Sequence, residues 1–103
     1  MRIDDIVIAQ DAKDDLIEAK SFYDSNEVGI GDYFFDNIIS EIESLKLSAG
    51  IHFKSYGLYR LLARRFPYAI YYDILDKTVV IVAVLDLRRD PKFIKKQISA
   101  RVH

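Results

Sequence analysis

The spacing of apolar residues alternates between period two and period three to four along the chain. Residues 3–9 form a short β-rich run that predicts a strand. The apolar residues that follow recur every three or four positions and predict one face of an amphipathic helix: Ala12, Leu16, Ala19 and Tyr23. Asp11 is the predicted N-cap of this helix, and Asp14 and Asp15 fall in its first turn, where carboxylates suit the helix dipole. The polar and glycine-containing residues 25–31 should end it.

A second helix is predicted from about Asp32 to residue 49, because Gly50 suits the position that follows a helix. Its apolar stripe consists of Phe35, Ile38, Ile42 and Leu45, widened by Phe34 and Ile39. The loop between the two predicted helices is short, so the helices should run antiparallel.

Three apolar runs in the second half of the chain predict strands over residues 58–63, 68–74 and 79–85. The last two flank the polar residues 75–78, so they should pair as a hairpin, whereas residues 51–57 are predicted to form a loop. The run 79–85 is apolar on both faces, which favours the central strand. A short C-terminal helix over residues 91–98 is also compatible with the pattern.

The resulting order, β-α-α-β-β-β, predicts an α+β fold. The N-terminal helical hairpin should pack on one face of a small, mainly antiparallel twisted sheet. With 103 residues, half of them hydrophobic, residues 1–103 are predicted to form one ordered domain. The absence of cysteine excludes disulfides and thiolate catalysis. The longest apolar run has seven residues, and the N-terminus lacks a signal-peptide pattern, so we expect a cytoplasmic protein without a membrane segment.

Charge is distributed unevenly between the two halves of the chain. Residues 1–50 hold 12 acidic and 4 basic side chains, whereas residues 51–103 hold 4 acidic and 11 basic ones. The basic half includes the arginine pairs at residues 64–65 and 88–89, which flank the predicted hairpin. This asymmetry indicates a polyanionic target, an acidic partner, or both.

Several motifs occur together with this element order. The segment RFPYAIYY at residues 65–72 is followed by AVLDLRRDP at residues 83–91, and an AxxDL pattern starts the first helix at residue 12. The combination resembles the RelE/ParE superfamily of bacterial toxins from type II toxin–antitoxin modules, over nearly the whole chain. The resemblance implies a RelE/ParE-like fold. It also implies a toxin held inactive by a cognate acidic antitoxin, which wraps an extended segment and a helix along its surface.

The superfamily divides by target. RelE-like toxins cleave messenger RNA in the ribosomal A site, whereas ParE-like toxins, which include plasmid-stabilisation proteins, inhibit DNA gyrase. RNA cleavage of the RelE type uses no metal, but it needs a base, an acid and cations that stabilise the phosphorane. The two branches therefore imply different activities. A RelE-like member would be an enzyme, whereas a ParE-like member would act by binding its target.

For a nuclease, the resemblance points to Lys54, Arg64 and Arg65 as catalytic candidates. Arg64 matches an arginine that contacts the scissile phosphate in the RelE branch. Leu87, however, stands where ribosome-dependent members commonly place arginine or histidine, and Phe93 stands in the region of a late catalytic tyrosine. Positioned acid and base groups contribute about 10²–10⁴-fold each, so their absence argues against an efficient nuclease.

A cationic surface is predicted to contact the target or the antitoxin. Its members are Arg60, Arg64, Arg65, Arg88, Arg89, Lys92, Lys95 and Lys96. At least one arginine should instead be structural, since Arg88 or Arg89 could form a bidentate salt bridge with Asp86 or Asp90.

Most tyrosines and phenylalanines are predicted to lie in the core, and Tyr71 is the one expected to be open to a ligand. His52 is predicted to be a solvent-exposed loop residue. No metal site is expected from two distant histidines, and no cofactor is expected.

The leading hypothesis is a ParE-like toxin that inhibits DNA gyrase and forms a hetero-oligomer with its antitoxin. One alternative is a ribosome-dependent endoribonuclease of the RelE type. The other is a degenerate toxin that retains only antitoxin binding.

Overall fold

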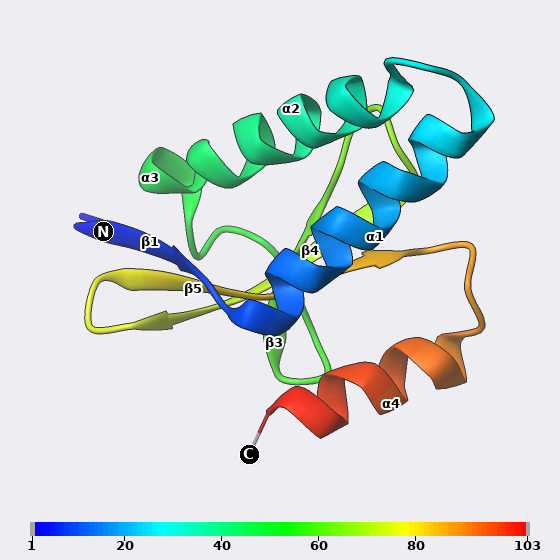
Figure 1. Cartoon of the computed structure of the whole chain (residues 1–103). Helices are drawn as coiled ribbons and strands as arrows, with labels where there is room; N and C mark the ends of the chain where they lie inside the picture. The colour runs from blue at the N-terminus through cyan, green and yellow to red at the C-terminus, as the bar shows by residue number, and fades with distance from the viewer. Residues whose placement is uncertain (1, 103) are drawn as a thin grey trace.

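The computed structural model describes residues 2–102 and has an α+β fold built on a five-stranded sheet (Figure 1). In chain order the elements are β1 (Asp5–Ile8), α1 (Gln10–Asn26), α2 (Ile30–Glu43), α3 (Leu45–Ser48), β2 (Lys54–Ser55), β3 (Leu58–Leu62), β4 (Tyr68–Leu75), β5 (Thr78–Asp86) and α4 (Pro91–Arg101). The strand order is β1-β5-β4-β3-β2. β1 runs parallel to β5 and the other neighbours are antiparallel, which confirms the predicted mainly antiparallel sheet.

Most predicted elements are confirmed, with boundaries shifted by a few residues. The second predicted helix begins at Ile30 rather than Asp32, and it is divided at Ser44 into α2 and α3. The predicted loop at residues 51–57 contains the two-residue strand β2, which pairs with β3. β5 is an interior strand, but the middle of the sheet belongs to β4, so the prediction of β5 as the central strand was wrong.

The sheet separates two hydrophobic clusters. α1 and α2 cover one face, where their buried side chains meet Tyr68, Ile70 and Tyr72 of β4. α4 lies on the opposite side of the sheet (Figure 1), where its isoleucines pack with Ala69 and Tyr71. Successive side chains of a strand point to opposite faces, so β4 is buried from both sides along its first five residues.

The helical hairpin depends on Gly31, near the start of α2. A Cβ atom at this position would lie 2.4 Å from the backbone carbonyl oxygen of Lys20 and 2.4 Å from the carboxyl group of Asp24. The Gly31 N–H also donates a hydrogen bond of 2.8 Å to Asp24 Oδ1. Glycine therefore allows α2 to begin in direct contact with the end of α1.

The β4–β5 hairpin closes through Asp76 and Lys77, whose φ angles are 50° and 68°. Two successive residues with positive φ are the pattern of a type I′ turn, whose twist matches that of paired strands. This tight connection, which the polar residues 75–78 predicted, brings the basic ends of the hairpin to the other end of the sheet.

Candidate functional site

Both arginine pairs lie at the same end of the sheet. Arg64 and Arg65 belong to the connection between β3 and β4, and Arg88 and Arg89 follow β5 directly. The register pairs the first residue of β4 with the last residue of β5, so the two connections lie next to each other. We call these four residues the basic end.

Aromatic rings from α1, α2 and the start of β4 support the basic end. They are Tyr23, Phe34, Phe66 and Tyr68. The rings of Phe34 and Tyr68 pack edge to face with centroids 4.9 Å apart. Burial raises the pKa of Tyr68 to about 12, so its hydroxyl stays neutral at physiological pH. The arginines thus lie next to a packed cluster of uncharged aromatic rings.

Arg64 and Arg65 both contact α2 while remaining exposed to solvent. The Nε atom of Arg64 lies 3.6 Å from Glu41 Oε1, and the Arg64 side chain is 86% exposed. Arg65 Nη1 donates a hydrogen bond of 2.8 Å to the hydroxyl of Tyr33. A hollow of about 180 Å³ lies beside them and is also lined by Ser40 and other residues of α2. Arg64 thus has an acidic partner in Glu41, whose side chain is 18% exposed, whereas the partner of Arg65 is a neutral hydroxyl. Both arginine side chains remain exposed, so both can contact an anionic surface.

Arg88 has the structural role that the sequence predicted. Its Nε and Nη2 atoms donate to the Asp86 carboxylate at 2.9 and 2.7 Å, in a bidentate arrangement. The Arg88 hydrogen bond lowers the pKa of Asp86 below its usual value. Arg88 therefore fixes the chain as it leaves β5.

Arg89 and the lysines of α4 are placed differently. The guanidinium of Arg89 lies over the ring of Phe93, 3.9 Å from its centroid, in a cation–π contact. Lys92, Lys95 and Lys96 are exposed on α4. They extend the positive charge away from the basic end along this helix.

Tyr71 is not open to a ligand, contrary to the prediction. Its side chain is only 1% exposed, because α4 covers the sheet face on which it lies. The prediction assumed that one face of the sheet would be free, and α4 occupies that face. Arg60 is the cross-strand neighbour of Tyr71. Burial raises the pKa of Tyr71, and the nearby Arg60 guanidinium partly offsets this increase.

The structure does not assemble the nuclease candidates. Lys54 lies on β2, opposite Tyr59 near the start of β3, with its Nζ atom 4.7 Å from the centre of the Tyr59 ring, whereas Arg64 lies beyond the end of β3. At about 3.3 Å per residue, Lys54 is roughly 10 Å from the end of β3 at Leu62, and Arg64 follows two residues after that end. Leu87 packs against the α4 cluster. These residues therefore do not converge on one phosphate.

His52 lies in a loop, as predicted, but its side chain is partly buried, so the prediction of a solvent-exposed residue was wrong. Its Nδ1 atom lies 2.6 Å from the hydroxyl of Tyr72, which also accepts a hydrogen bond of 2.9 Å from the Gly50 N–H. Since the hydroxyl accepts from Gly50, it can donate its proton to a neutral imidazole. Burial lowers the pKa of His52, which favours this neutral form.

Residues 2–102 show no metal-binding cluster and no membrane-spanning helix. Within this range there is no group of three or more histidine or acidic side chains placed to hold a metal ion. No helix in the same range is both long and apolar enough to cross a membrane.

Residues 6–91 match the family model of the ParE toxin of the type II toxin–antitoxin system parDE. The chain belongs to the ParE toxin family. Its fold is similar to that of a chain in the solved structure of a chromosomal ParDE TA system from P. aeruginosa, with a TM-score of 0.73 and 15% identity. That match covers 81% of this chain and 95% of the other. No curated protein sequence gives a significant match.

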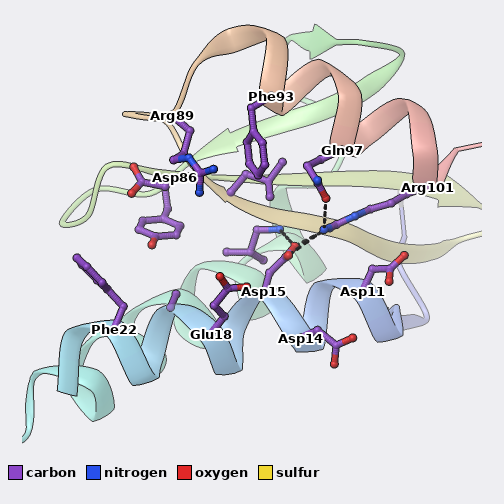
Figure 2. A pocket seen from close by; sticks show the side chains of 14 residues that line it. Asp11, Asp14, Asp15, Glu18, Phe22, Asp86, Arg89, Phe93, Gln97 and Arg101 are labelled. Carbon is purple, nitrogen blue, oxygen red and sulfur yellow. Dashed lines mark hydrogen bonds and ion pairs between the residues drawn. The ribbon is translucent and has the colours of Figure 1, made fainter. Parts of the chain in front are cut away.

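The family match ends at residue 91, where α4 of this ParE family member begins. α4 is fixed to the rest of the fold by an ion pair that the sequence analysis did not predict. Arg101 Nη1 and Nη2 donate to the two carboxylate oxygens of Asp15 at 2.6 and 2.9 Å (Figure 2). Asp15 Oδ2 also accepts from the Val84 N–H at 2.9 Å, and Arg101 donates to the Val82 carbonyl at 3.2 Å.

This ion pair replaces strand pairing at the outer edge of β5. Pairing between β1 and β5 ends at Ile8 and Ile81, and beyond that point the edge of β5 meets Asp15 and Arg101 instead. A pocket of about 450 Å³ lies between α1 and α4 beside the pair (Figure 2). Asp15 had been interpreted as a helix-dipole carboxylate. Its position three residues after Ala12 and four before Ala19, both buried, was the available signal that it lies near the inward face of α1.

Proposed function

We propose that this ParE family member is the toxin of a type II toxin–antitoxin module, that it inhibits DNA gyrase, and that a cognate antitoxin neutralises it. The observation that carries the proposal is the family match over residues 6–91. The ParDE system whose fold is similar supports an antitoxin as partner.

The basic end supplies the contact surface in this proposal. Arg64 and Arg65 are exposed, while the rings beneath them and the Arg88–Asp86 pair hold their surroundings rigid. A rigid cationic surface binds an anionic partner without first ordering a flexible segment. The same surface suits either DNA held by gyrase or an acidic segment of the antitoxin, so antitoxin binding would block access to the target.

The arrangement of the nuclease candidates favours binding over catalysis. A proton-transferring group must lie within hydrogen-bond reach of the group that it serves. Lys54 lies opposite Tyr59 near the start of β3, whereas Arg64 lies beyond the end of that strand. Leu87 can neither transfer a proton nor bind a phosphate. The exposed Arg64–Arg65 pair beside a hollow is the one observation that favours an RNA-cleaving alternative.

The test is induced expression, with gyrase activity and translation measured in parallel. We expect growth arrest, inhibition of supercoiling by purified toxin or trapping of cleaved gyrase–DNA complexes, and reversal of each effect by the antitoxin. Unchanged gyrase activity at stoichiometric excess would refute gyrase as the target. Codon-positioned mRNA cleavage in primer extension would instead establish the endoribonuclease, and absence of growth arrest would indicate a toxin that retains only antitoxin binding.

A matched pair of variants connects the outcome to the basic end. Arg64→Glu with Arg65→Glu should abolish growth arrest. Lys77→Glu, which reverses an exposed cation at the tip of the β4–β5 hairpin, at the other end of β5, should leave growth arrest intact.

A further inference from the structure

The pocket between α1 and α4 has two kinds of wall. Asp11, Asp14 and Glu18 line the α1 side, and the rings of Phe22 and Phe93 line other parts (Figure 2). Arg89 and Arg101 line it as well, but they are held by the Phe93 ring and by Asp15. None of Asp11, Asp14 and Glu18 has an ion-pair partner within residues 2–102. Phe22 is 49% exposed, so the core does not account for it. Arg89 already covers the ring of Phe93, so the exposed ring is that of Phe22. A lysine of a second molecule suits this side of the pocket, because its methylene stem can pack on Phe22 while its ammonium reaches the α1 carboxylates.

Exposed lysines lie on α4 itself, which forms the other side of the pocket. Lys92, Lys95 and Lys96 are exposed, and none forms an ion pair within the described chain. The side of α4 that faces the pocket instead carries Phe93 and Gln97, four residues apart. With 3.6 residues per turn, the lysines project to other sides of the helix. They are therefore better placed to contact a second molecule than the pocket of their own chain.

We propose that two copies of this chain associate through the α1–α4 region, with the lysines of α4 in each copy against the α1 carboxylates of the other. The complementary surfaces are neighbours on one molecule, so a twofold axis forms both contacts at once and closes the assembly as a dimer. A net charge of −1 leaves little overall repulsion between copies.

The dimer should be held mainly by contacts between exposed charges. Contacts between exposed charges are individually weak and are screened by salt, so the dimer should be reversible and should dissociate at high ionic strength. Arg64 and Arg65 lie beside a different hollow, which shares no lining residue with the α1–α4 pocket. Dimerisation would therefore leave these two arginines of the basic end exposed.

Sedimentation velocity and light scattering on the purified full chain test the proposal directly, with cell-free synthesis to avoid toxicity. At about 0.05 M salt we expect a dimer that forms as concentration rises. At about 0.5 M salt the dissociation constant should be at least roughly tenfold larger, because the Debye length falls severalfold. A monomer at every concentration in low salt, or a dimer indifferent to salt, would overturn the proposal.

Charge reversal identifies the surfaces. Two triple variants, Asp11→Lys with Asp14→Lys and Glu18→Lys, and Lys92→Glu with Lys95→Glu and Lys96→Glu, should each be monomeric. Mixed in equal amounts, they should form a heterodimer in which every reversed surface meets a reversed partner.

A matched control reverses three exposed carboxylates of the other helical region: Glu27→Lys, Asp36→Lys and Glu43→Lys. This control should dimerise like the wild type. Circular dichroism establishes that each variant is folded, and Asn or Gln replacements at the three α1 positions serve if the lysine variant does not fold. Retained dimerisation of either reversed α1 or α4 surface, or failure of the mixture to pair, would refute the assignment.

Discussion

Removal of Asp15 should destabilise the fold more than a charge substitution at the surface normally does. The side chains of Asp15 and Arg101 are only 11% and 12% exposed, so neither charge is well solvated if the other is lost. In Asp15→Ala, the Arg101 guanidinium loses both carboxylate acceptors and the Val84 N–H loses its acceptor. Removing one partner of a buried pair costs about 3–5 kcal/mol. We expect about 3 kcal/mol, because the pair lies beside an open pocket that admits water.

Asp15 and Arg101 should also be energetically coupled. Arg101→Met should cost about 2 kcal/mol, since Asp15 keeps its hydrogen bond from the Val84 N–H. The double variant should cost about 3 kcal/mol rather than the sum of the two single costs. Once one partner is gone, removing the other also removes the unpaired buried charge. A coupling of about 2 kcal/mol would thus identify a direct interaction.

Urea unfolding followed by circular dichroism measures these free energies, and thermal unfolding provides a second reading. For a chain of this size, 3 kcal/mol corresponds to a fall in Tm of roughly 10–20 °C. The exposed Arg2–Asp4 pair, with side chains 86% and 54% exposed, is the control, and Arg2→Ala should change stability by less than about 0.5 kcal/mol. A loss below about 1 kcal/mol in Asp15→Ala, or full additivity in the double variant, would refute the reasoning.

Three further predictions follow from the core and the basic end. Stability should fall as pH decreases below about 6.5, because burial lowers the folded-state pKa of His52 and the unfolded chain then binds the proton more tightly. Urea midpoints across this pH range should lose that component in His52→Gln, and an unchanged profile would contradict it. Gly31→Ala should destabilise the protein by about 1–3 kcal/mol, because the new Cβ meets a backbone carbonyl oxygen at 2.4 Å; an unchanged Tm would show that α2 can shift freely. Arg64→Glu with Arg65→Glu should remove growth arrest while Tm stays within about 3 °C, since both side chains are exposed; arrest that persists in folded variant protein would exclude this surface.

The parts of the fold that depend on local patterns were predictable from the sequence. The period-four stripe of α1 and the two-residue turn at Asp76 and Lys77 are set by neighbouring residues. The Arg88–Asp86 pair was one of the pairings predicted between Arg88 or Arg89 and Asp86 or Asp90, and its partners are only two residues apart. The basic end was predictable once the hairpin was assigned, since a hairpin fixes which segments lie at its open end.

The errors arose where distant segments meet. Tyr71 was expected to be exposed because period-two alternation shows which residues share a face but not what covers that face. The Asp15–Arg101 pair joins residues 86 positions apart, and no local spacing indicates such a pairing. Both errors concern α4, which lies beyond the residues that match the family. His52 was misplaced for a similar reason, because Tyr72 is 20 residues away.

Placement of α4 also changes the meaning of the charge asymmetry. A division into an acidic first half and a basic second half suggests one negative face and one positive face. The fold instead brings the basic helix α4 beside the acidic helix α1, and Asp15 and Arg101 join them (Figure 2). Positive charge is therefore used in three ways: Arg101 and Arg88 stabilise the fold, Arg64 and Arg65 form the exposed surface proposed to bind the target, and the α4 lysines lie next to unpaired carboxylates. Net charge alone cannot distinguish these uses, because they differ in how exposed each cation is and in which partner it has: Arg101 is 12% exposed and paired with Asp15, whereas Arg64 is 86% exposed although it contacts Glu41.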